Sequence, residues 1–368
     1  MPETTDVRCE IYCQKGKFLN AAFSLKVQTS ELSSLPVHTG GYEKDGVRVT
    51  ITEQEINGCQ IGEISVHIRN ESCRENDNLR AESPVRVYLP TEELPEKITA
   101  MYLYNEWWTR PAFVNSLEDI PARTQVAFFQ YKDRYACFVP MIGQAFKTYL
   151  IPGTKTEIGL EMTAWTGGQR SLEEPLYLLA EAPVLQDAIH KAFSWLAEYK
   201  GIRMRKDRRI PEMFRYLGWC SWDAFYKEVS EKGIRDKAAE LTEKKVPVAW
   251  MLIDDGWLSA RDELLSDFIP DKGKFPEGFR KMTDDIREQN NIRWFGVWHA
   301  LGGYWGGVAP ESDLALIERS HLYSTVNGKL VPSPYTGDKF YHDWYRELNR
   351  EGISFVKVDG QSAVPYYF

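Results

Sequence analysis

Charged side chains that could carry chemistry lie at the end of an apolar run near residue 358. The run at residues 353–358 delivers Lys357 and Asp359, two positions apart. Successive side chains of a strand point to opposite faces, so these two share one face. A carboxylate at a strand end can act as a nucleophile, and a neighbouring ammonium group favours its charged form. The pattern predicts an enzyme site with Asp359 as the attacking group.

Three earlier apolar runs end in polar and aromatic residues in the same way. In a barrel of parallel strands the C-terminal strand ends carry the chemistry, so these residues are expected to meet. Flat aromatic rings pack against the apolar C–H faces of sugars, and carboxylates accept hydrogen bonds from sugar hydroxyls. The predicted site therefore contains, beside Asp359 and Lys357, the residues Asp254, Asp255, Trp257, Trp222, Asp223 and Trp298.

Each of these features also has an ordinary structural explanation. Asp254, Asp255 and Gly256 could form a solvated turn, and Asp223 could cap the next segment. His299 alone is more typical of a core histidine, and the glycine-rich loop at residues 302–307 could be turn chemistry. The recurrence of one pattern at four successive strand ends favours the functional interpretation.

The elements that must position these residues follow a strand–helix rhythm from residue 214 onward. Nearly continuous apolar runs at residues 216–220, 248–253, 292–298 and 353–358 are typical of buried parallel strands. Helical spacing appears near residues 230, 277–290, 311–318 and 340–351. Without a GxGxxG turn, the order predicts the first four strands of a (β/α)8 TIM-type barrel over residues 214–368.

The first half of the chain has a different pattern, that of an antiparallel β-sandwich domain over residues 1–180. Alternating runs recur at residues 47–51, 64–68, 85–89, 126–131 and 135–139. Residues 181–213 are expected to form a linker helix followed by a basic linker. The fold class is thus multidomain, a β domain followed by part of an α/β barrel.

Composition narrows the function classes. A net charge of −8 over 368 residues argues against nucleic acid as a partner, and no apolar run is long enough to span a membrane. The start of the sequence lacks the basic and apolar segments of a signal peptide, and the six Cys are scattered without a CxxC pair. We expect reduced thiols, a cytoplasmic location, and neither a metal nor a cofactor. Aromatic residues make up 13% of the chain and include 12 Trp, which suits a carbohydrate ligand.

Four segments together carry a resemblance to a known family. They read LGWCSWDAFY (217–226), LIDDGW (252–257), VWHAL with WGGV (297–308) and VKVDGQ (356–361). This series resembles glycoside hydrolase family 36, in its raffinose synthase, seed imbibition and alkaline α-galactosidase branch. Residues 105–111, NEWWTRP, are similar to a tryptophan-bearing segment of that family.

The resemblance implies a retaining α-galactosidase or α-galactosyltransferase acting on α-galactoside oligosaccharides. It implies that Asp359 is the nucleophile, that Lys357 contacts the galactose, and that Asp254 and Asp255 bind hydroxyls. Trp222 and Trp298 would be walls of the sugar site, and Trp108 would reach it from the β domain. The family's general acid/base is an Asp in an Arg-x-x-x-Asp motif after the nucleophile. No such motif follows Asp359 here, so we expect a homo-oligomer partner or a missing C-terminal half to complete the barrel.

Two other interpretations remain open at this point. One is a non-catalytic carbohydrate-binding protein, or an inactive fragment, that keeps a sugar site without the acid. The other is a barrel enzyme of the aldolase type, with Lys357 forming a Schiff base. That reaction needs an uncharged Lys in an apolar pocket, whereas a carboxylate nearby would keep Lys357 charged.

Overall fold

The structure, a computed structural model, describes residues 4–13, 16–28, 37–44, 46–68, 78–164 and 167–366. The chain divides into two compact units, residues 1–208 and residues 209–368. Among the residues described, no helix combines the length and the apolar content that crossing a membrane requires. Five described cysteines are free thiols, and Cys73 lies outside the described residues.

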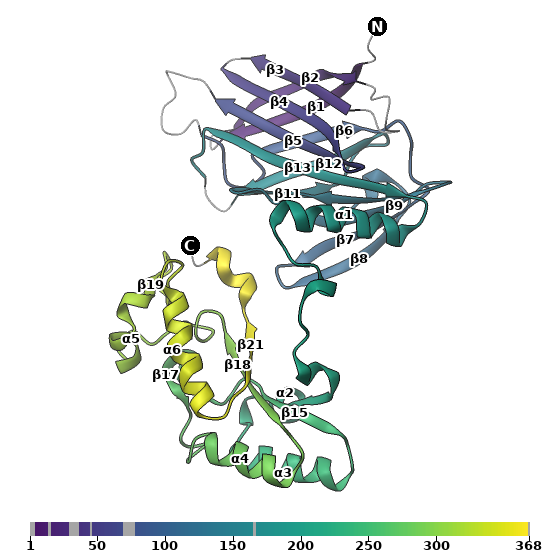
Figure 1. The fold of residues 1–368 in the computed structure, drawn as a ribbon. Helices are drawn as coiled ribbons and strands as arrows, with labels where there is room; N and C mark the ends of the chain where they lie inside the picture. The colour runs from purple at the N-terminus through teal and green to yellow at the C-terminus, as the bar shows by residue number, and fades with distance from the viewer. Residues whose placement is uncertain are drawn as a thin grey trace. The chain divides into compact units, whose positions relative to one another are not determined.

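The first unit is built on one large antiparallel sheet (Figure 1). Its thirteen strands follow the order β10-β13-β5-β4-β3-β2-β1-β6-β12-β11-β9-β7-β8, and β9 also pairs with β10. The sheet therefore turns back on itself at β9. The strands are β1 (Thr4–Cys13), β2 (Gly16–Gln28), β3 (Val37–Lys44), β4 (Val47–Ile56), β5 (Cys59–Ile68), β6 (Val85–Pro90), β7 (Lys97–Asn105), β8 (Trp108–Val114), β9 (Thr124–Gln130), β10 (Tyr135–Pro140), β11 (Phe146–Ile151), β12 (Glu157–Ala164) and β13 (Ser171–Ala182).

Alternation of side chains gives this sheet one shared core. Along β4 the residues Val47, Val49 and Ile51 are buried while those between them are half-buried, as a strand with one covered face requires. The helix α1 (Leu185–Lys200) covers a second, smaller cluster with Ala188 and Ala192. The helix is capped by Gly201, which adopts a left-handed conformation with φ +64°. Glycine suits this position because it has no Cβ to make that conformation unfavourable.

The second unit contains a four-stranded parallel sheet in the order β14-β15-β18-β21. A β-hairpin, β16–β17, follows β15, and a second one, β19–β20, precedes α6. The elements are β14 (Leu217–Cys220), α2 (Trp222–Phe225), α3 (Glu231–Glu243), β15 (Val248–Ile253), β16 (Leu258–Arg261), β17 (Leu264–Pro270), α4 (Arg280–Gln289), β18 (Trp294–Ala300), α5 (Asp313–Ile317), β19 (Leu322–Ser324), β20 (Leu330–Pro332), α6 (Gly337–Arg350) and β21 (Phe355–Asp359).

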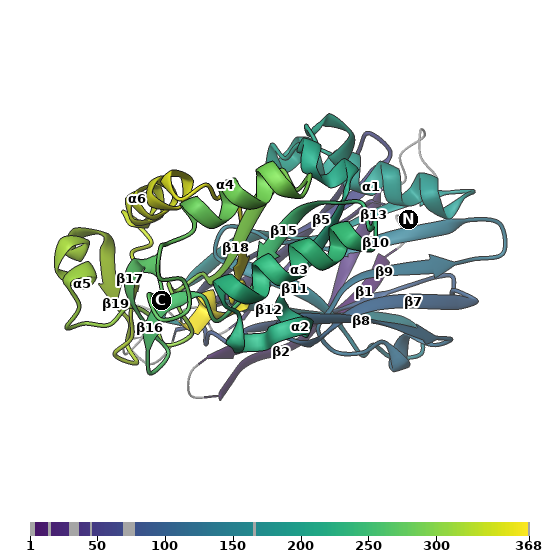
Figure 2. The same cartoon turned by 90° about the horizontal axis from the view of Figure 1, so that it is seen from below.

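Helices cover one face of this parallel sheet. α3, α4 and α6 place Ile234, Met282 and Trp344 in the same core as Met251 and Val297 of the central strands (Figures 1 and 2). α3 begins where Ser230 accepts a hydrogen bond from the N–H of Gly233, which satisfies one of the free donors of its first turn. Since one set of strand side chains packs against the helices, the alternate set points to the opposite face of the sheet.

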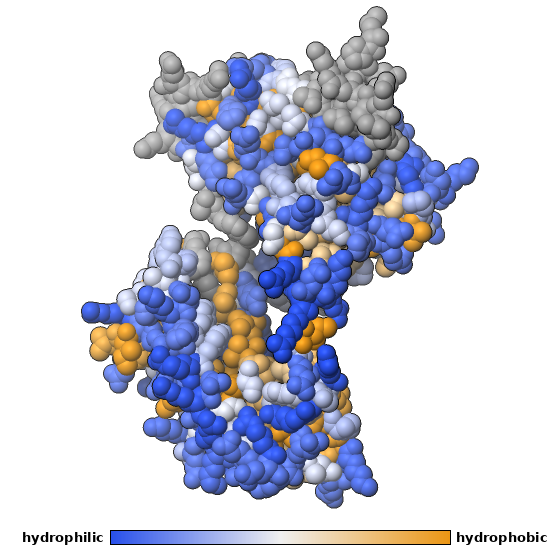
Figure 3. Space-filling model, viewed as in Figure 1, coloured by the Kyte–Doolittle hydropathy of each residue, from blue (hydrophilic) through white to orange (hydrophobic). Residues whose placement is uncertain are grey.

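The opposite face of the sheet is not covered by these helices. There Trp250 lies across Gly218, and Phe355 lies across Gly296, because a Cβ at either glycine would meet the neighbouring ring at 1.9 or 2.2 Å. Cys220, Lys357 and Asp359 alternate onto the same face and are exposed. In Figure 3 apolar surface appears on this unit where Figure 1 draws β21. The predicted site residues Lys357 and Asp359 therefore lie on the open face.

The sequence-based elements differ from these in a few places. The third parallel strand lies two residues later than expected, at Trp294–Ala300, so that His299 and Ala300 are also inside it. The hairpin β16–β17 between the second strand and its helix was not expected, since its residues alternate over only a few positions. The strands of the first unit are also longer and more numerous than the short runs predicted.

Candidate active site

Lys357 and Asp254 form an ion pair at the open ends of β21 and β15. Lys357 Nζ donates to Asp254 Oδ2 at 2.8 Å, and the Cys220 thiol reaches the same oxygen at 3.2 Å. Asp254 Oδ1 accepts from the backbone N–H of Asp255 at 2.9 Å, so both oxygens of this buried carboxylate are engaged. Partial burial is the largest single influence and lowers the pKa of Lys357, but the hydrogen bond to Asp254 together with the nearby negative charges of Asp254 and Asp359 outweighs it, so the pKa is raised overall. The ammonium group therefore stays charged near neutral pH.

Asp255 serves the loop that follows β18. Its two oxygens accept from the Tyr304 hydroxyl at 2.9 Å and from the Trp305 indole N–H at 3.3 Å. Lys227 Nζ lies 3.9 Å from Asp255 and 3.0 Å from Glu263. Burial and the hydrogen bond to Asp255 raise the pKa of Tyr304 to about 12, so Tyr304 remains a donor. Asp255 is thus buried, and its carboxylate accepts hydrogen bonds from side chains of the loop after β18.

Asp359 is exposed and oriented by two N–H donors. Trp298 Nε1 donates to Asp359 Oδ2 at 3.2 Å, and the backbone N–H of Gly360 donates to Oδ1 at 2.7 Å. Gly360 adopts φ +70°, a conformation that L residues rarely take, and this turn brings its N–H toward the carboxylate. A fixed and accessible carboxylate is the geometry that an attacking group needs.

The predicted residues of three strands therefore belong to one network. Lys357 contacts Asp254, Asp254 contacts Asp255, and Asp255 contacts Trp305. Trp305 packs against Trp298 with ring centroids 5.3 Å apart, and Trp298 holds Asp359. The ends of β15, β18 and β21 are thus connected through side chains as well as through the sheet, and β14 joins them through Cys220.

The other predicted residues have different surroundings. Trp222 and Asp223 lie in α2, where the Trp222 ring packs edge-to-face on Tyr226 at 5.2 Å and Asp223 is exposed. Trp257 is fully buried and donates to the backbone oxygen of Trp298 at 2.8 Å, so it supports the strand from within the core. Trp108 lies on β8 of the first unit, half-exposed beneath Arg110. Its reach to the sugar site stays a prediction.

His299 faces the helices and is a core residue. Its Nδ1 donates to the backbone oxygen of Ala300 at 3.0 Å, and its Nε2 accepts from the Tyr345 hydroxyl at 2.9 Å. Burial lowers the pKa of His299 to about 4, which keeps the ring neutral. The hydrogen bonds therefore support the alternative weighed from the sequence, that His299 is a core histidine.

Sequence reasoning missed four residues of the network: Cys220, Lys227, Tyr304 and Trp305. Tyr304 and Trp305 lie in the glycine-rich loop that the sequence analysis weighed as turn chemistry. A tyrosine and a tryptophan set between pairs of glycines were the available signal. Such a loop places two large side chains on a backbone that passes close to its neighbours.

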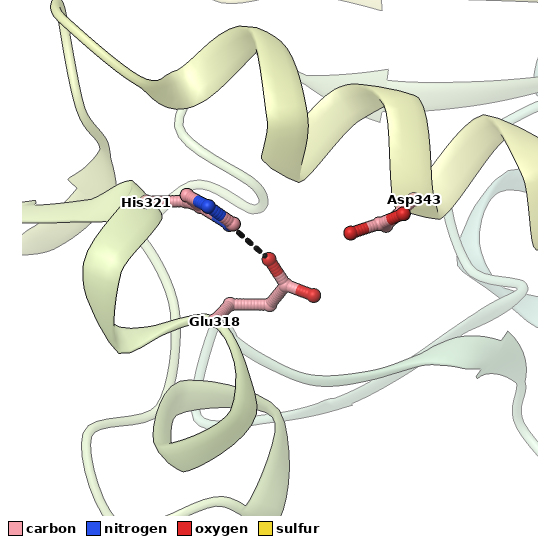
Figure 4. A group of neighbouring side chains, drawn as sticks. All are labelled: Glu318, His321 and Asp343. Atoms are coloured by element: carbon pink, nitrogen blue, oxygen red, sulfur yellow. Dashed lines mark hydrogen bonds and ion pairs between the residues drawn. The ribbon is translucent and has the colours of Figure 1, made fainter.

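A second group of polar side chains lies away from the strand ends, at the short 3-10 helix that follows α5 and on α6. The ligand atoms of Glu318, His321 and Asp343 all lie within 4.8 Å of one another (Figure 4). Glu318 is buried and accepts from His321 Nδ1 at 2.9 Å, while Asp343 pairs with Arg346 at 3.0 Å. The Glu318 carboxylate already accepts a hydrogen bond and the Asp343 carboxylate already has a cation, so we interpret the group as a polar cluster that holds this part of the unit together.

Solved structures share the fold of this chain. The chain resembles the GH36 α-galactosidase AgaA from Geobacillus stearothermophilus with a TM-score of 0.56 and 15% identity, covering 95% of this chain and 54% of that one. The galactosidase domain of the α-galactosidase-sucrose kinase AgaSK gives a TM-score of 0.54 at 12% identity. Both its large antiparallel sheet and its parallel β/α unit thus belong to a GH36 α-galactosidase fold.

The family profile for "raffinose synthase or seed imbibition protein Sip1" matches residues 94–267 and 265–365, and the chain belongs to this family. A probable galactinol–sucrose galactosyltransferase of Arabidopsis thaliana is 24% identical over 322 residues, which are 73% of this chain and 43% of that protein. The galactinol–sucrose galactosyltransferase of Pisum sativum is 26% identical over 323 residues, 72% of this chain and 40% of that protein. The chain therefore spans less than half the length of these curated relatives.

Proposed function

We propose that this chain carries the nucleophile half of an enzyme that cleaves or transfers α-galactosyl groups. The observation that carries the proposal is the Asp359 carboxylate, exposed and held by two N–H donors beside the charged Lys357. Family membership supports it, because relatives are named galactinol–sucrose galactosyltransferases and stachyose synthase. A solved neighbour is described in complex with raffinose, which supports α-galactoside oligosaccharides as the substrate class.

In the proposed reaction an oxygen of Asp359 attacks the anomeric carbon of the galactose. The bond from that carbon to the leaving oxygen breaks, and the leaving oxygen takes the electron pair and a proton. Water or a sugar hydroxyl then attacks the galactosyl–Asp359 ester, so hydrolysis and transfer share one intermediate. Retention of configuration needs a second carboxyl group about 5–5.5 Å from the first, acting as acid and then as base.

We propose that none of the 368 residues of this chain is this acid. Asp254 and Asp255 are the nearest carboxylates along the network, but all their oxygens already accept hydrogen bonds from protein groups. In this proposal Lys357 contacts the galactose, because 44% of its side chain is exposed while its ammonium group is held by Asp254. Asp254 then acts by holding Lys357, and Asp255 by holding the loop.

The parallel sheet would be the first half of a (β/α)8 barrel. Its strands β14 and β21 each have a neighbour on one side only within the described sheet, and apolar side chains lie on its open face. Unpaired strand edges invite further strands. We propose that four more strands, from a C-terminal half or from a second copy of the chain, complete it, and that the first unit is a β-sandwich.

Two alternative functions are a carbohydrate-binding protein and a Schiff-base enzyme, and the structure disfavours the second. A carbohydrate-binding protein without catalysis would need the same sugar contacts, so only a covalent or turnover measurement separates it from the enzyme. A Schiff base at Lys357 is disfavoured, since the pair with Asp254 raises the pKa of Lys357 and an amine must be uncharged to attack a carbonyl. For location we keep the cytoplasm as a proposal, supported by the free thiols.

A burst experiment with an aryl α-galactoside tests the function. An acidic phenol leaves without a proton, so the test does not depend on the general acid. We expect a burst of phenolate no larger than the amount of protein, then slow or no turnover, and no cleavage of raffinose. General acid help is typically worth about 10²–10⁴-fold, which is why the sugar leaving group should fail.

The controls are chosen so that folding and attack are separated. Asp359→Asn should abolish the burst, whereas Asp262→Asn on the exposed hairpin should leave it unchanged. An aryl β-galactoside should give no burst. Release of phenolate by the Asp359→Asn variant, or rapid turnover of raffinose by the 368-residue chain, would contradict the proposal.

A further inference from the structure

The tryptophan expected to form the wall of the sugar site is itself covered. Trp298 is only 1% exposed, and its indole edge is used to hold Asp359. The Trp305 ring lies against it with centroids 5.3 Å apart and 46° between planes, and Trp305 is 39% exposed. On this side of the site the aromatic surface open to a ligand is therefore that of Trp305.

Trp305 also lies beside the turn that orients the nucleophile. A Cβ built on Gly360 would approach Trp305 Cζ3 at 3.6 Å, which is van der Waals contact. Gly360 donates its N–H to Asp359, so the indole borders the very residue that fixes the carboxylate. A sugar attacked by Asp359 would have the Trp305 ring within reach.

The loop that carries Trp305 is fixed on two sides. The backbone N–H of Gly306 donates to the Glu263 oxygen at 2.8 Å, and Val308 N–H donates to the Leu330 oxygen at 2.7 Å. Lys329 Nζ donates to the Trp305 oxygen at 3.2 Å, and the indole N–H reaches Asp255. Since hairpins on both sides hold the loop, the ring is positioned before any ligand arrives, which lowers the cost of binding.

We propose that Trp305 is the sugar-stacking residue of this site, presenting its indole face to the apolar C–H face of one ring of an α-galactoside. This inference rests on the proposed function and adds a specificity residue to it. The chemistry recognised is that of a pyranose ring with an apolar face, in the galactose or in the unit linked to it. Buried Trp298 has the role of a positioning residue for Asp359.

A purely structural role for Trp305 makes a different prediction. If the residue served only to donate its N–H to Asp255, any ring without that N–H would fail equally. Trp305→Phe keeps an aromatic face and removes the N–H, whereas Trp305→Ala removes both. Tyr335→Ala removes an aromatic ring that is 86% exposed elsewhere on the same unit and serves as the matched control.

Isothermal titration calorimetry of the 368-residue chain with raffinose and with 1-deoxygalactonojirimycin tests the inference. We expect Trp305→Ala to weaken raffinose binding about tenfold, and Trp305→Phe to stay within about threefold of the unchanged chain. Tyr335→Ala should bind as the unchanged chain does. A loss restricted to raffinose places the stacked ring outside the galactose, and a loss with both ligands places it on the galactose position; either supports the inference.

Two results would overturn it, and they are distinguishable. If the unchanged chain binds both ligands and Trp305→Ala binds them equally well, or Trp305→Phe is as weak as Trp305→Ala, stacking on Trp305 is wrong while the proposed function stands. If the unchanged chain binds neither ligand, the proposed function fails and this inference fails with it. Circular dichroism of each variant confirms that the fold is kept.

Discussion

The two sheets of this molecule solve the same packing problem in different ways. The thirteen-stranded antiparallel sheet turns back at β9, and its inward side chains share one core. The four-stranded parallel sheet has helices on one face and exposes Lys357 and Asp359 on the other. Central strands β15 and β18 are almost wholly buried, while β14 and β21 are not. The comparison teaches that the predicted site residues gather on the sheet that keeps one face open.

The largest expected effect comes from removing tryptophans in the two units. Trp298→Ala should destabilise the second unit by about 3–5 kcal/mol, because it empties a buried site and frees Asp359. Trp107→Ala, at a position 75% exposed in the first unit, should change stability by no more than about 0.5 kcal/mol. Urea unfolding followed by circular dichroism measures both. Equal effects would contradict the assignment of Trp298 to the core.

The next effect is a loss of stability in acid that belongs to the helix-covered face. Burial lowers the pKa of His299 from 6.5 to about 4, so between these values the unfolded chain binds a proton that the folded chain refuses. Stability at His299 is therefore complete above pH 6.5 and falls as the pH drops toward 4, by about 3 kcal/mol in all. Denaturation midpoints across this range should fall less steeply for His299→Gln. An identical slope in that variant would show that other groups cause the loss.

A smaller effect is expected on the open face, at the Lys357–Asp254 pair. Lys357→Met leaves the buried Asp254 carboxylate without its cation and should cost about 1–2 kcal/mol, less than a fully buried pair because Lys357 is half in water. It should also abolish the phenolate burst. Lys232→Met, which breaks the exposed pair with Asp236, should cost less than about 0.5 kcal/mol. If the two substitutions cost the same, Asp254 is better solvated than its burial indicates.

The smallest effect concerns the cluster of Glu318, His321 and Asp343. Because Arg346 already pairs with Asp343, we expect neither zinc chloride nor EDTA to move the thermal midpoint of the chain. His321→Gln should lower stability by about 1 kcal/mol through its lost hydrogen bond to Glu318. A rise of the midpoint with zinc that His321→Gln removes would show that the cluster is a metal site instead.

Strand ends were readable from the sequence because their signal is local. Apolar runs closed by Asp254, Asp255, Lys357 and Asp359 place the polar groups at one edge whichever helices follow. The hydrogen-bond partner of each group depends on the tertiary structure. Lys357 was expected to serve its neighbour Asp359 but bonds Asp254, and Asp255 holds the loop after β18. Nothing in the spacing of the sequence distinguishes these pairings.

Burial was the harder property to predict for the tryptophans. Trp257 and Trp298 were both expected to contact sugar, yet each has its indole N–H engaged within the protein and its ring in the core. Trp305 was not among the predicted site residues, although it is the partly exposed ring beside Gly360. A strand-end tryptophan is covered or open according to the loop that folds over it, and loop paths follow from contacts distant in sequence.

The central claim is that Asp359 is the group that attacks an α-galactoside, and locating the covalent label tests it most directly. The chain is incubated with an aryl α-galactoside, quenched in acid, digested and mapped by tandem mass spectrometry. The account predicts a galactosyl ester on the peptide that contains Asp359, absent from the Asp359→Asn variant and present in Asp262→Asn. A label on Asp254, Asp255 or Lys357, or one that persists in Asp359→Asn, would contradict it.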